Sequence, residues 1–278
     1  MNPISLASGV VPEFGPLETI RAAASAGFDA VGLWVDPAQW CAQTTRDARY
    51  ALADCALPVL DVEVVWLKPG HDMVDHLRVI DIGAELGAAH VLCVSSHTQA
   101  GETIADLTTL CRHAEGSGIR VMLEFGIFTQ VRDLTAARDI IDAVGHPLRG
   151  ILVDPIHVDR SGTAIADIAA LDPALLPYAQ FCDASAKRPD PADFNAVITD
   201  AIDLREQCGM GALPLADLYP ALPHNIPLSI ELRSQALRDG WPEADARAKI
   251  VAAITRDWLA AHTGLAIVPV TNQAGRNP

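Results

Sequence analysis

The chain has 278 residues, of which 50% are hydrophobic, with a formal charge of −15 and an isoelectric point near 4.8. This length and apolar content are enough for one large core, and no part of the sequence has the composition of a disordered segment. The negative charge argues against a nucleic acid or an anionic membrane as partner, because either would meet a repelling field. A small-molecule substrate is therefore expected.

The sequence shows neither a secretory leader nor a membrane span. Its first residues lack a basic region followed by an apolar run, and no apolar stretch is long enough to cross a bilayer. The six cysteines are scattered without a CxxC pair, which favours reduced thiols over a disulfide framework. We therefore expect a soluble, cytoplasmic protein, for which a homo-oligomer is compatible with the sequence.

Strands and helices alternate through the first half of the chain. Each apolar, β-branched run is followed by apolar residues at helical spacing, and most of these helices end at a glycine. The expected strands cover residues 3–8, 29–36, 58–67 and 90–96, and the expected helices cover 16–27, 44–56, 72–86 and 102–115.

The second half repeats the same unit four times. The expected strands cover residues 121–126, 151–155, 178–185 and 228–234, and the expected helices cover 134–144, 164–171, 191–204 and 242–261. Eight such units within about 250 residues predict an α/β fold, a single (β/α)8 TIM barrel over residues 1–263. The alternative, a doubly wound open sheet, needs a glycine-rich phosphate turn after the first strand, and residues 8–15, SGVVPEFG, do not form one.

Two segments fall outside the alternation. Residues 208–223 form a long insertion before the last expected strand, and an insertion at the mouth of a barrel often covers the substrate. Residues 264–278 have no periodicity and are expected to be a loosely held C-terminal tail.

Four consecutive expected strands, the fifth to the eighth, end in polar side chains: Glu124, Asp154, Gln180 and Glu231. Because the carboxyl ends of barrel strands surround one mouth, these side chains should face one another. Three carboxylates and an amide oxygen would repel unless a cation lay between them, and oxygen ligands suit Mg²⁺ or Mn²⁺. His157, one helical turn after Asp154, would extend the choice to Co²⁺ or Zn²⁺.

Each of these residues by itself has an ordinary explanation. A single glutamate at a strand end is usually a solvated rim charge, and a single histidine is usually a hydrogen-bonded structural residue. Four polar side chains inside otherwise apolar runs are costly to bury without a function, so the coincidence favours the metal site.

Further polar and aromatic residues near the strand ends are candidates for contact with a substrate. Glu63, at the end of the third strand, and His97, just after the fourth, could bind hydroxyls. Arg160 and Arg205 could neutralise an anionic group, and the aromatic rings that could face a substrate ring are Trp34 and Trp66. The ordinary alternatives are a surface ion pair for each arginine and plain packing for each tryptophan. Asp183 and Arg233 lie next to the ligand strands and are candidates to orient Gln180 and Glu231 through hydrogen bonds.

Several runs of the chain, LEFG, DPIHVDRSG, AQFCDA, GMGALPL and SIELRS, resemble the sugar phosphate isomerase/epimerase family of xylose isomerase-like TIM barrels. The resemblance extends from ISLASG to the last helix, and the D-x-x-H pair is its most specific part. It implies that Glu124, Asp154, Gln180 and Glu231 hold a divalent metal. The family's commoner ligand at Gln180 is histidine, whereas members similar to 3-dehydroshikimate dehydratases use glutamine. An all-oxygen site should favour Mg²⁺ or Mn²⁺ over Zn²⁺.

The resemblance implies an enzyme of carbohydrate metabolism. The first interpretation is a metal-dependent isomerase or epimerase that transfers a proton next to the carbonyl of a sugar, cyclitol or related polyhydroxylated ketone, with Glu124 and Glu231 as acid/base groups and His157 on a substrate oxygen. The alternative is a dehydratase, a lyase of 3-dehydroshikimate or an inosose, in which His157 is the acid/base. A second alternative is a sugar-binding barrel without catalysis.

Overall fold

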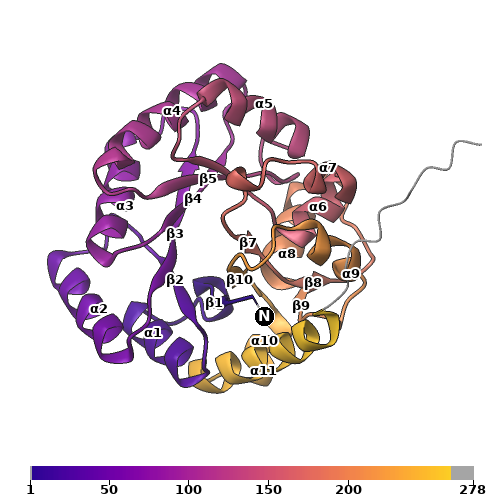
Figure 1. Cartoon of the computed structure of the whole chain (residues 1–278). Coiled ribbons are helices and arrows are strands. Elements are labelled where there is room, and N and C mark those ends of the chain that lie inside the picture. The colour runs from indigo at the N-terminus through magenta and orange to yellow at the C-terminus, as the bar shows by residue number, and fades with distance from the viewer. Residues whose placement is uncertain (1, 264–278) are drawn as a thin grey trace, which may run out of the picture.

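Eight parallel strands surround a central axis, and helices cover them from outside (Figure 1). The computed structural model describes residues 2–263, so the predicted tail, 264–278, lies outside the described residues. The sheet order is β6-β5-β4-β3-β2-β1-β10-β7, and the N–H of Gln180 donates to the carbonyl of Val153 (2.9 Å) between the two edges. This nearly closed barrel confirms the predicted (β/α)8 fold. Its strands are β1 (Ile4–Leu6), β2 (Ala30–Trp34), β3 (Val59–Leu67), β4 (His90–Ser95), β5 (Arg120–Glu124), β6 (Arg149–Leu152), β7 (Ala179–Gln180) and β10 (Leu228–Ile230).

The longer helices form the outer layer and bury their apolar faces against the strands. They are α1 (Pro16–Ser25), α2 (Ala42–Cys55), α3 (Met73–Leu86), α4 (Ala100–His113), α5 (Leu134–Val144) and α11 (Ala244–His262). Helix α5 has the predicted bounds because its ends are encoded locally. Asp133 accepts a hydrogen bond from the N–H of Ala136, and Gly145 ends the helix at φ 61°.

Shorter elements connect this framework. They are the helices α6 (Pro155–Ser161), α7 (Ile165–Ala169), α8 (Phe194–Asp203), α9 (Leu215–Leu218) and α10 (Gln235–Gly240), the 3-10 helices η1 (Ser8–Val10), η2 (Ala114–Gly116), η3 (Pro173–Leu175) and η4 (Tyr219–Ala221), and the strands β8 (Asp183–Ala184) and β9 (Arg205–Glu206). Within residues 2–263, no helix combines the length and the apolarity that crossing a bilayer requires.

The chain turns into a helix immediately after β6, where the sequence predicted a loop. The Asp154 carboxylate accepts from the N–H of Ile156, and Pro155 occupies the first helical position, where its fixed φ suits a helix. His157 and Arg160 consequently lie on α6, which ends at Gly162. The predicted helix at 164–171 is reduced to the five residues of α7.

The seventh predicted strand, 178–185, is wrong in its length. Only two residues pair with the barrel as β7, and β8 instead pairs antiparallel with β9. The Asp183 carboxylate accepts from the N–H groups of Gly209 (3.0 Å) and Leu213 (2.9 Å), which binds this part of the chain to the following loop. Asp183 thus fixes the segment after the barrel strand.

The prediction that residues 208–223 cover the barrel mouth is also wrong. Tyr219 packs against Trp258 of α11, with ring centroids 5.7 Å apart, and its hydroxyl donates to Asn2 at 2.7 Å. Asn2 precedes β1, so the insertion lies against the outside of the barrel near the start of that strand. Tyr219, the one aromatic residue of the insertion, is half-buried at this position.

Two apolar clusters make up the core. The larger one fills the space between the strands and the helices. The smaller one fills the inside of the barrel, and its buried members are Ala30, Leu60, Leu92, Val94, Met122, Leu152 and Tyr178. The polar strand ends therefore lie above a largely apolar filling, where charges interact strongly.

Candidate active site

Four polar side chains lie at the carboxyl ends of neighbouring barrel strands. Glu124 and Gln180 are the last residues of β5 and β7, whereas Asp154 and Glu231 follow the ends of β6 and β10. All four are at most 5% exposed. Glu124, Gln180 and Glu231 line one hollow of about 170 Å³, and the Gln180 amide joins them to Asp154.

The Gln180 amide group contacts two carboxylates at once. One of its terminal atoms lies 3.0 Å from Oδ2 of Asp154 and 2.7 Å from Oε1 of Glu124. If that atom is nitrogen, it donates to both carboxylates; if it is oxygen, three oxygens converge and require a cation between them. The donor set therefore fits a divalent metal ion, with the amide turning its oxygen toward the ion.

The charges of the site also fit a divalent ion. Among the residues that the structure describes, two guanidinium groups, those of Arg205 and Arg233, face the four carboxyl groups of Glu63, Glu124, Asp154 and Glu231. The excess of two negative charges equals the charge of one Mg²⁺ or Mn²⁺. Oε2 of Glu231 is buried and has no hydrogen-bond partner among the described residues, which leaves a free ligand atom.

Burial and mutual repulsion raise the pKa of two carboxyl groups of the site. Burial, together with Asp154, raises the pKa of Glu124 well above its usual value. Burial and the charge of Glu231 raise the pKa of Glu63 to about 7. Asp61, one layer deeper in the barrel, also has a pKa raised well above its usual value by burial and by Glu63, which favours its neutral form. These pKa shifts show how strongly the site would favour an added positive charge.

Asp154 remains ionised because Arg205 is bonded to it. The Arg205 guanidinium donates to Asp154 and, at 3.0 Å, to the carbonyl of Glu231. Although burial opposes ionisation, Arg205 and His157 lower the pKa of Asp154. Arg205 lines the hollow, but its guanidinium is engaged with the residues around the site.

His157 lies beside Glu124 and is neutral at pH 7. Its Nε2 is 3.9 Å from Oε1 of Glu124, and its ring packs against Phe128 with centroids 4.7 Å apart. Burial lowers the pKa of His157 to about 4. The imidazole can therefore donate or accept one proton at the edge of the hollow.

Two of the sequence candidates lie outside this hollow. Arg160 is buried, donates from Nε to Asp200 of α8 (2.9 Å), and pairs with its neighbour Asp159. His97 points to α4, where its Nε2 lies 2.7 Å from the Asp106 carboxylate.

The rim of the hollow carries the other candidates. Trp34 is 48% exposed, and the guanidinium carbon of Arg233 lies 5.8 Å from the centre of its ring. Nε of Arg233 donates to Oε1 of Glu231 at 2.8 Å, and Ser8 donates to Oε1 of Glu63 at 2.5 Å. Trp66 donates to Ser96 at 2.9 Å, so its indole N–H is already satisfied.

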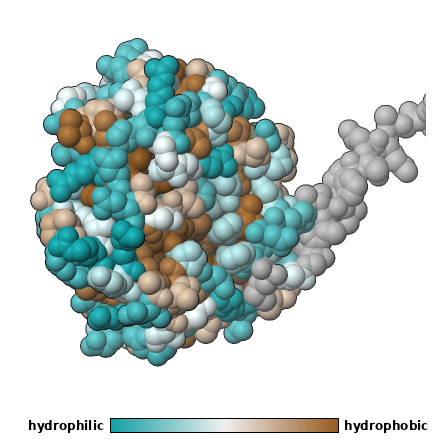
Figure 2. All heavy atoms as spheres, turned by 60° about the vertical axis from the view of Figure 1, so that its left-hand side comes forward, coloured by the Kyte–Doolittle hydropathy of each residue, from teal (hydrophilic) through white to brown (hydrophobic). Residues whose placement is uncertain are grey.

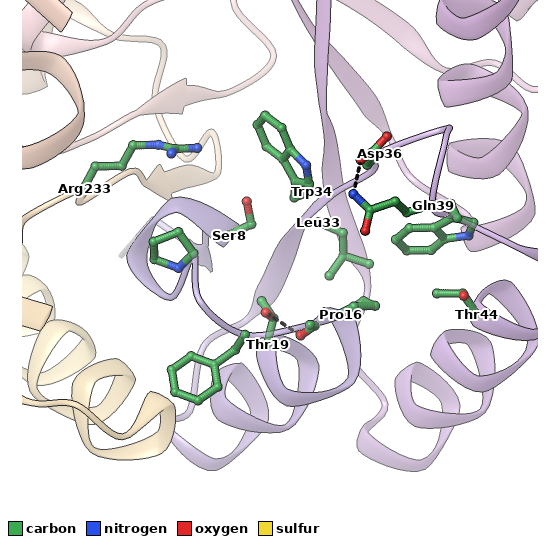
Figure 3. A pocket seen from close by; sticks show the side chains of 13 residues that line it. Ser8, Pro16, Thr19, Leu33, Trp34, Asp36, Gln39, Thr44 and Arg233 are labelled. Atoms are coloured by element: carbon green, nitrogen blue, oxygen red, sulfur yellow. Dashed lines mark hydrogen bonds between the residues drawn. The ribbon is translucent and has the colours of Figure 1, made fainter.

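A second hollow of about 410 Å³ adjoins the first. Trp34 and Arg233 line both, and Figure 3 shows Arg233 pointing toward Trp34, with Asp36 and Gln39 on the far side of the ring. In Figure 2, hydrophobic side chains gather near the centre of the face shown, and hydrophilic ones surround them. A substrate bound at the carboxylates would have room to extend across Trp34.

Several site residues were not predicted from the sequence. Ser8, Phe128 and, from α8, Ile198 and Ile202 all contact the site or line its hollow. Their positions depend on how the loops after β1 and β5 fold back and on the docking of α8. Nothing in their local sequence marks them as part of a site.

Comparison with known proteins gives a consistent picture. Residues 20–252 match the family described as "Xylose isomerase-like TIM barrel". No curated protein matches the chain. A solved fusion of such a barrel with 4-hydroxyphenylpyruvate dioxygenase is matched over 97% of this chain but only 45% of its own length, with a TM-score of 0.78 and 20% identity.

Three further solved structures are matched over nearly their whole length. The IolI protein, solved with a zinc atom, has a TM-score of 0.78 at 16% identity (95% of this chain, 100% of that one). D-allulose 3-epimerase from Methylomonas sp., in complex with D-allulose, has a TM-score of 0.69 at 14% identity, over 92% of this chain and 96% of that one. AsbF from Bacillus anthracis, a "probable 3-DHS dehydratase", has a TM-score of 0.69 at 14% identity, over 90% of this chain and 98% of that one. At these identities the likeness is one of fold.

Proposed function

Because the chain belongs to the xylose isomerase-like TIM barrel family, we propose that it is a divalent-metal-dependent isomerase or epimerase of a sugar, cyclitol or related polyhydroxylated ketone. One observation carries this proposal: Glu124, Asp154, Gln180 and Glu231 meet with an excess of negative charge and an unpaired carboxylate oxygen. The likeness in fold to an epimerase of D-allulose is consistent with it.

The metal would be held by Glu124, Asp154, Gln180 and Glu231, and their oxygens favour Mg²⁺ or Mn²⁺. His157 beside them would also permit Co²⁺ or Zn²⁺. When bound, the ion would polarise the substrate carbonyl and stabilise the negative charge that develops on its oxygen. Arg205 keeps Asp154 ionised and in place.

Glu124 and Glu231 are the proposed acid/base groups. Each is buried at the end of a strand, Glu124 at β5 and Glu231 at β10. One carboxylate would take the proton from the carbon next to the carbonyl, and the other would return a proton to the carbon skeleton. The pair between Arg233 and Glu231 would fix the orientation of that carboxylate.

The remaining contacts would bind the polyol. Glu63, whose pKa is about 7, can donate to or accept from a substrate hydroxyl. Trp34 and Trp66 would pack against the substrate, and Arg233 offers its free guanidinium nitrogens between the two hollows.

A dehydratase is the second candidate, and His157 is the observation that favours it. This imidazole borders the hollow beside Glu124. After it takes up the proton that a carboxylate has removed from the substrate carbon, the imidazolium can transfer a proton to a leaving β-hydroxyl, which departs as water. The substrate would then be a cyclic hydroxyketone such as 3-dehydroshikimate or an inosose. The fold likeness to AsbF is consistent with this candidate as well.

The test is incubation of the Mn²⁺-loaded protein with ketoses, inososes and cyclic hydroxyketones in D₂O. Deuterium at the carbon next to the carbonyl without loss of water supports the isomerase or epimerase. Loss of water supports the dehydratase. A protein that binds no metal and exchanges no deuterium with any of them would instead be a sugar-binding barrel.

Glu124→Gln and Glu231→Gln should each abolish turnover of whichever substrate reacts, because an amide cannot accept the proton. Deuterium exchange by mass spectrometry measures this. Glu115→Gln is the matched control, since Glu115 pairs with His146 on the outer surface. Turnover within twofold of the native enzyme in either site variant would remove that glutamate from the mechanism.

His157→Asn separates the two candidates. If His157 protonates a leaving hydroxyl, the variant should still exchange deuterium next to the carbonyl but lose the elimination of water. In an isomerase, His157→Asn should slow turnover without creating a difference between deuterium exchange and the elimination of water. Unchanged kinetics would exclude His157 from either role.

A further inference from the structure

A second group of metal-ligating side chains lies away from the proposed active site. Two such groups occur among residues 2–263, and the one on the barrel flank consists of His71, His97 and Asp106. Their nitrogen and oxygen ligand atoms all lie within 4.8 Å of one another. His71 precedes α3, His97 follows β4, and Asp106 is in α4, so three separate elements meet at this point.

The contacts of His71 turn its Nε2 toward this cluster. Its Nδ1 lies 2.6 Å from the carbonyl of Lys68 and 3.3 Å from the N of Lys68, and the shorter contact is favourable when Nδ1 carries the proton. The other ring nitrogen, Nε2, lies 3.5 Å from Oδ2 of Asp106. A positive charge between this nitrogen and the carboxylate, either a proton or a metal ion, makes their approach favourable. A backbone carbonyl on the second nitrogen is also the usual support of a metal-binding histidine.

Two neighbouring imidazoles have unused nitrogens. His97 is 8% exposed, and its Nε2 lies 2.7 Å from Oδ2 of Asp106. Its Nδ1 has no hydrogen-bond partner among residues 2–263 and lies 3.6 Å from the half-exposed Glu102. In the same part of the chain Nε2 of His76 is buried without a partner, and the His76 ring centre lies 4.7 Å from that of His71. Buried polar atoms are normally paired, so these nitrogens indicate a missing ligand.

We propose that His71, His97 and Asp106, with His76 as a fourth candidate ligand, form a second metal site that binds a transition metal ion such as Zn²⁺. Imidazole-rich sets of this kind favour Zn²⁺, Co²⁺ or Ni²⁺ and discriminate against Mg²⁺. The site is distinct from the oxygen-rich cluster at the strand ends. A bound ion would link the β3–α3 loop to α4 and thereby stabilise the flank of the barrel.

Solvent can reach the cluster. The side chains of His71 and Asp106 are 13% and 23% exposed, and His97 borders a hollow of about 340 Å³ between α4 and α5. An ion could therefore bind to the folded protein and be removed by a chelator.

The test compares metal stoichiometry in four proteins stripped with a chelator and dialysed against Zn²⁺ or Co²⁺. The wild type should bind one more ion per chain than Asp106→Asn or His71→Gln, and its Co²⁺ form should show the intense visible absorption of a nitrogen-containing, four-coordinate site. His113→Gln is the matched control. His113 lies on α4, as Asp106 does, and pairs with Asp81, so this variant removes a histidine–carboxylate pair outside the cluster. It should bind as many ions as the wild type.

Glu124→Gln separates this site from the proposed active site. The Co²⁺ absorption should survive in Glu124→Gln and disappear in Asp106→Asn. Equal stoichiometry in the wild type and both cluster variants, each folded by circular dichroism, would overturn the proposal and leave an imidazolium–carboxylate pair at this position. Loss of an ion from Glu124→Gln alone would also overturn the proposal of a second metal site, and it would leave the proposed function intact. Loss of an ion from the cluster variants alone would argue against a metal ion in the proposed active site.

Discussion

Gly9 controls the position of Glu231 at the scale of a single residue. A Cβ atom at Gly9 would lie 2.3 Å from Oε1 of Glu231 and 2.7 Å from Nε of Arg233, closer than real Cβ contacts. Gly9→Ala should therefore displace the Glu231–Arg233 pair and lower kcat/KM by about 100-fold, the cost of misplacing a catalytic group by about 1 Å. Gly101→Ala is the control, because nothing lies within 4 Å of its Cβ position. Full activity in Gly9→Ala would mean that the orientation of Glu231 is unimportant.

At the scale of elements, a buried ion pair holds α8 beside the mouth. Arg160 of α6 donates to both carboxylate oxygens of Asp200 on α8, at 2.9 and 3.2 Å, and Ile198 and Ile202 of that helix line the hollow. Asp200→Ala leaves the guanidinium without its main partner, so the free energy of unfolding in urea should fall by about 3 kcal/mol.

The control for this pair is Asp245→Ala, which breaks an exposed i,i+4 pair with Lys249. That variant should lose only about 0.4 kcal/mol. Asp200→Ala should also raise KM, because α8 is released from its position at the mouth. Equal stability of the two variants would show that the Arg160–Asp200 pair does not hold α8 in place.

At the scale of the whole molecule, buried histidines make stability depend on pH. Burial lowers the pKa of His90, inside the barrel, to about 4 from its usual value near 6.5. Between pH 6.5 and 4 the unfolded chain binds a proton at this residue and the native chain does not, so stability falls as the pH falls. Above pH 6.5 the titration of His90 does not reduce the free energy of unfolding. By pH 4 it reduces that free energy by about 3 kcal/mol.

The measurement is urea unfolding from pH 7.5 to 4 of the wild type and of His90→Gln. Glutamine can still donate to the carbonyl of Leu60, which Nδ1 of His90 approaches at 3.0 Å. Subtracting the two profiles isolates His90, because the other titrating groups are common to both proteins. Parallel profiles would mean that His90 is protonated in the native barrel.

Much of the fold could be predicted because it is encoded locally. The glycine at the end of α5, the Asp133 cap at its start and the apolar β-branched runs each act over a few residues, and they place most strands and helices within about two residues. The elements around strand seven could not be predicted in this way. There, the Asp183 carboxylate accepts hydrogen bonds from residues 209 and 213, which are distant in sequence. Because of these partners the chain leaves the barrel after β7.

The convergence of Glu124, Asp154, Gln180 and Glu231 could be predicted from their positions in the chain, because the period of the (β/α)8 unit puts consecutive strand ends around one mouth. The roles of the charged residues around them depend on contacts that form only when the chain folds. Arg205 and Arg160, candidates for binding a substrate anion, bond to carboxylates 51 and 40 residues away in sequence, and His97 faces Asp106 on the flank. A buried charge takes the partner that folding brings to it, and the sequence does not state which partner that will be.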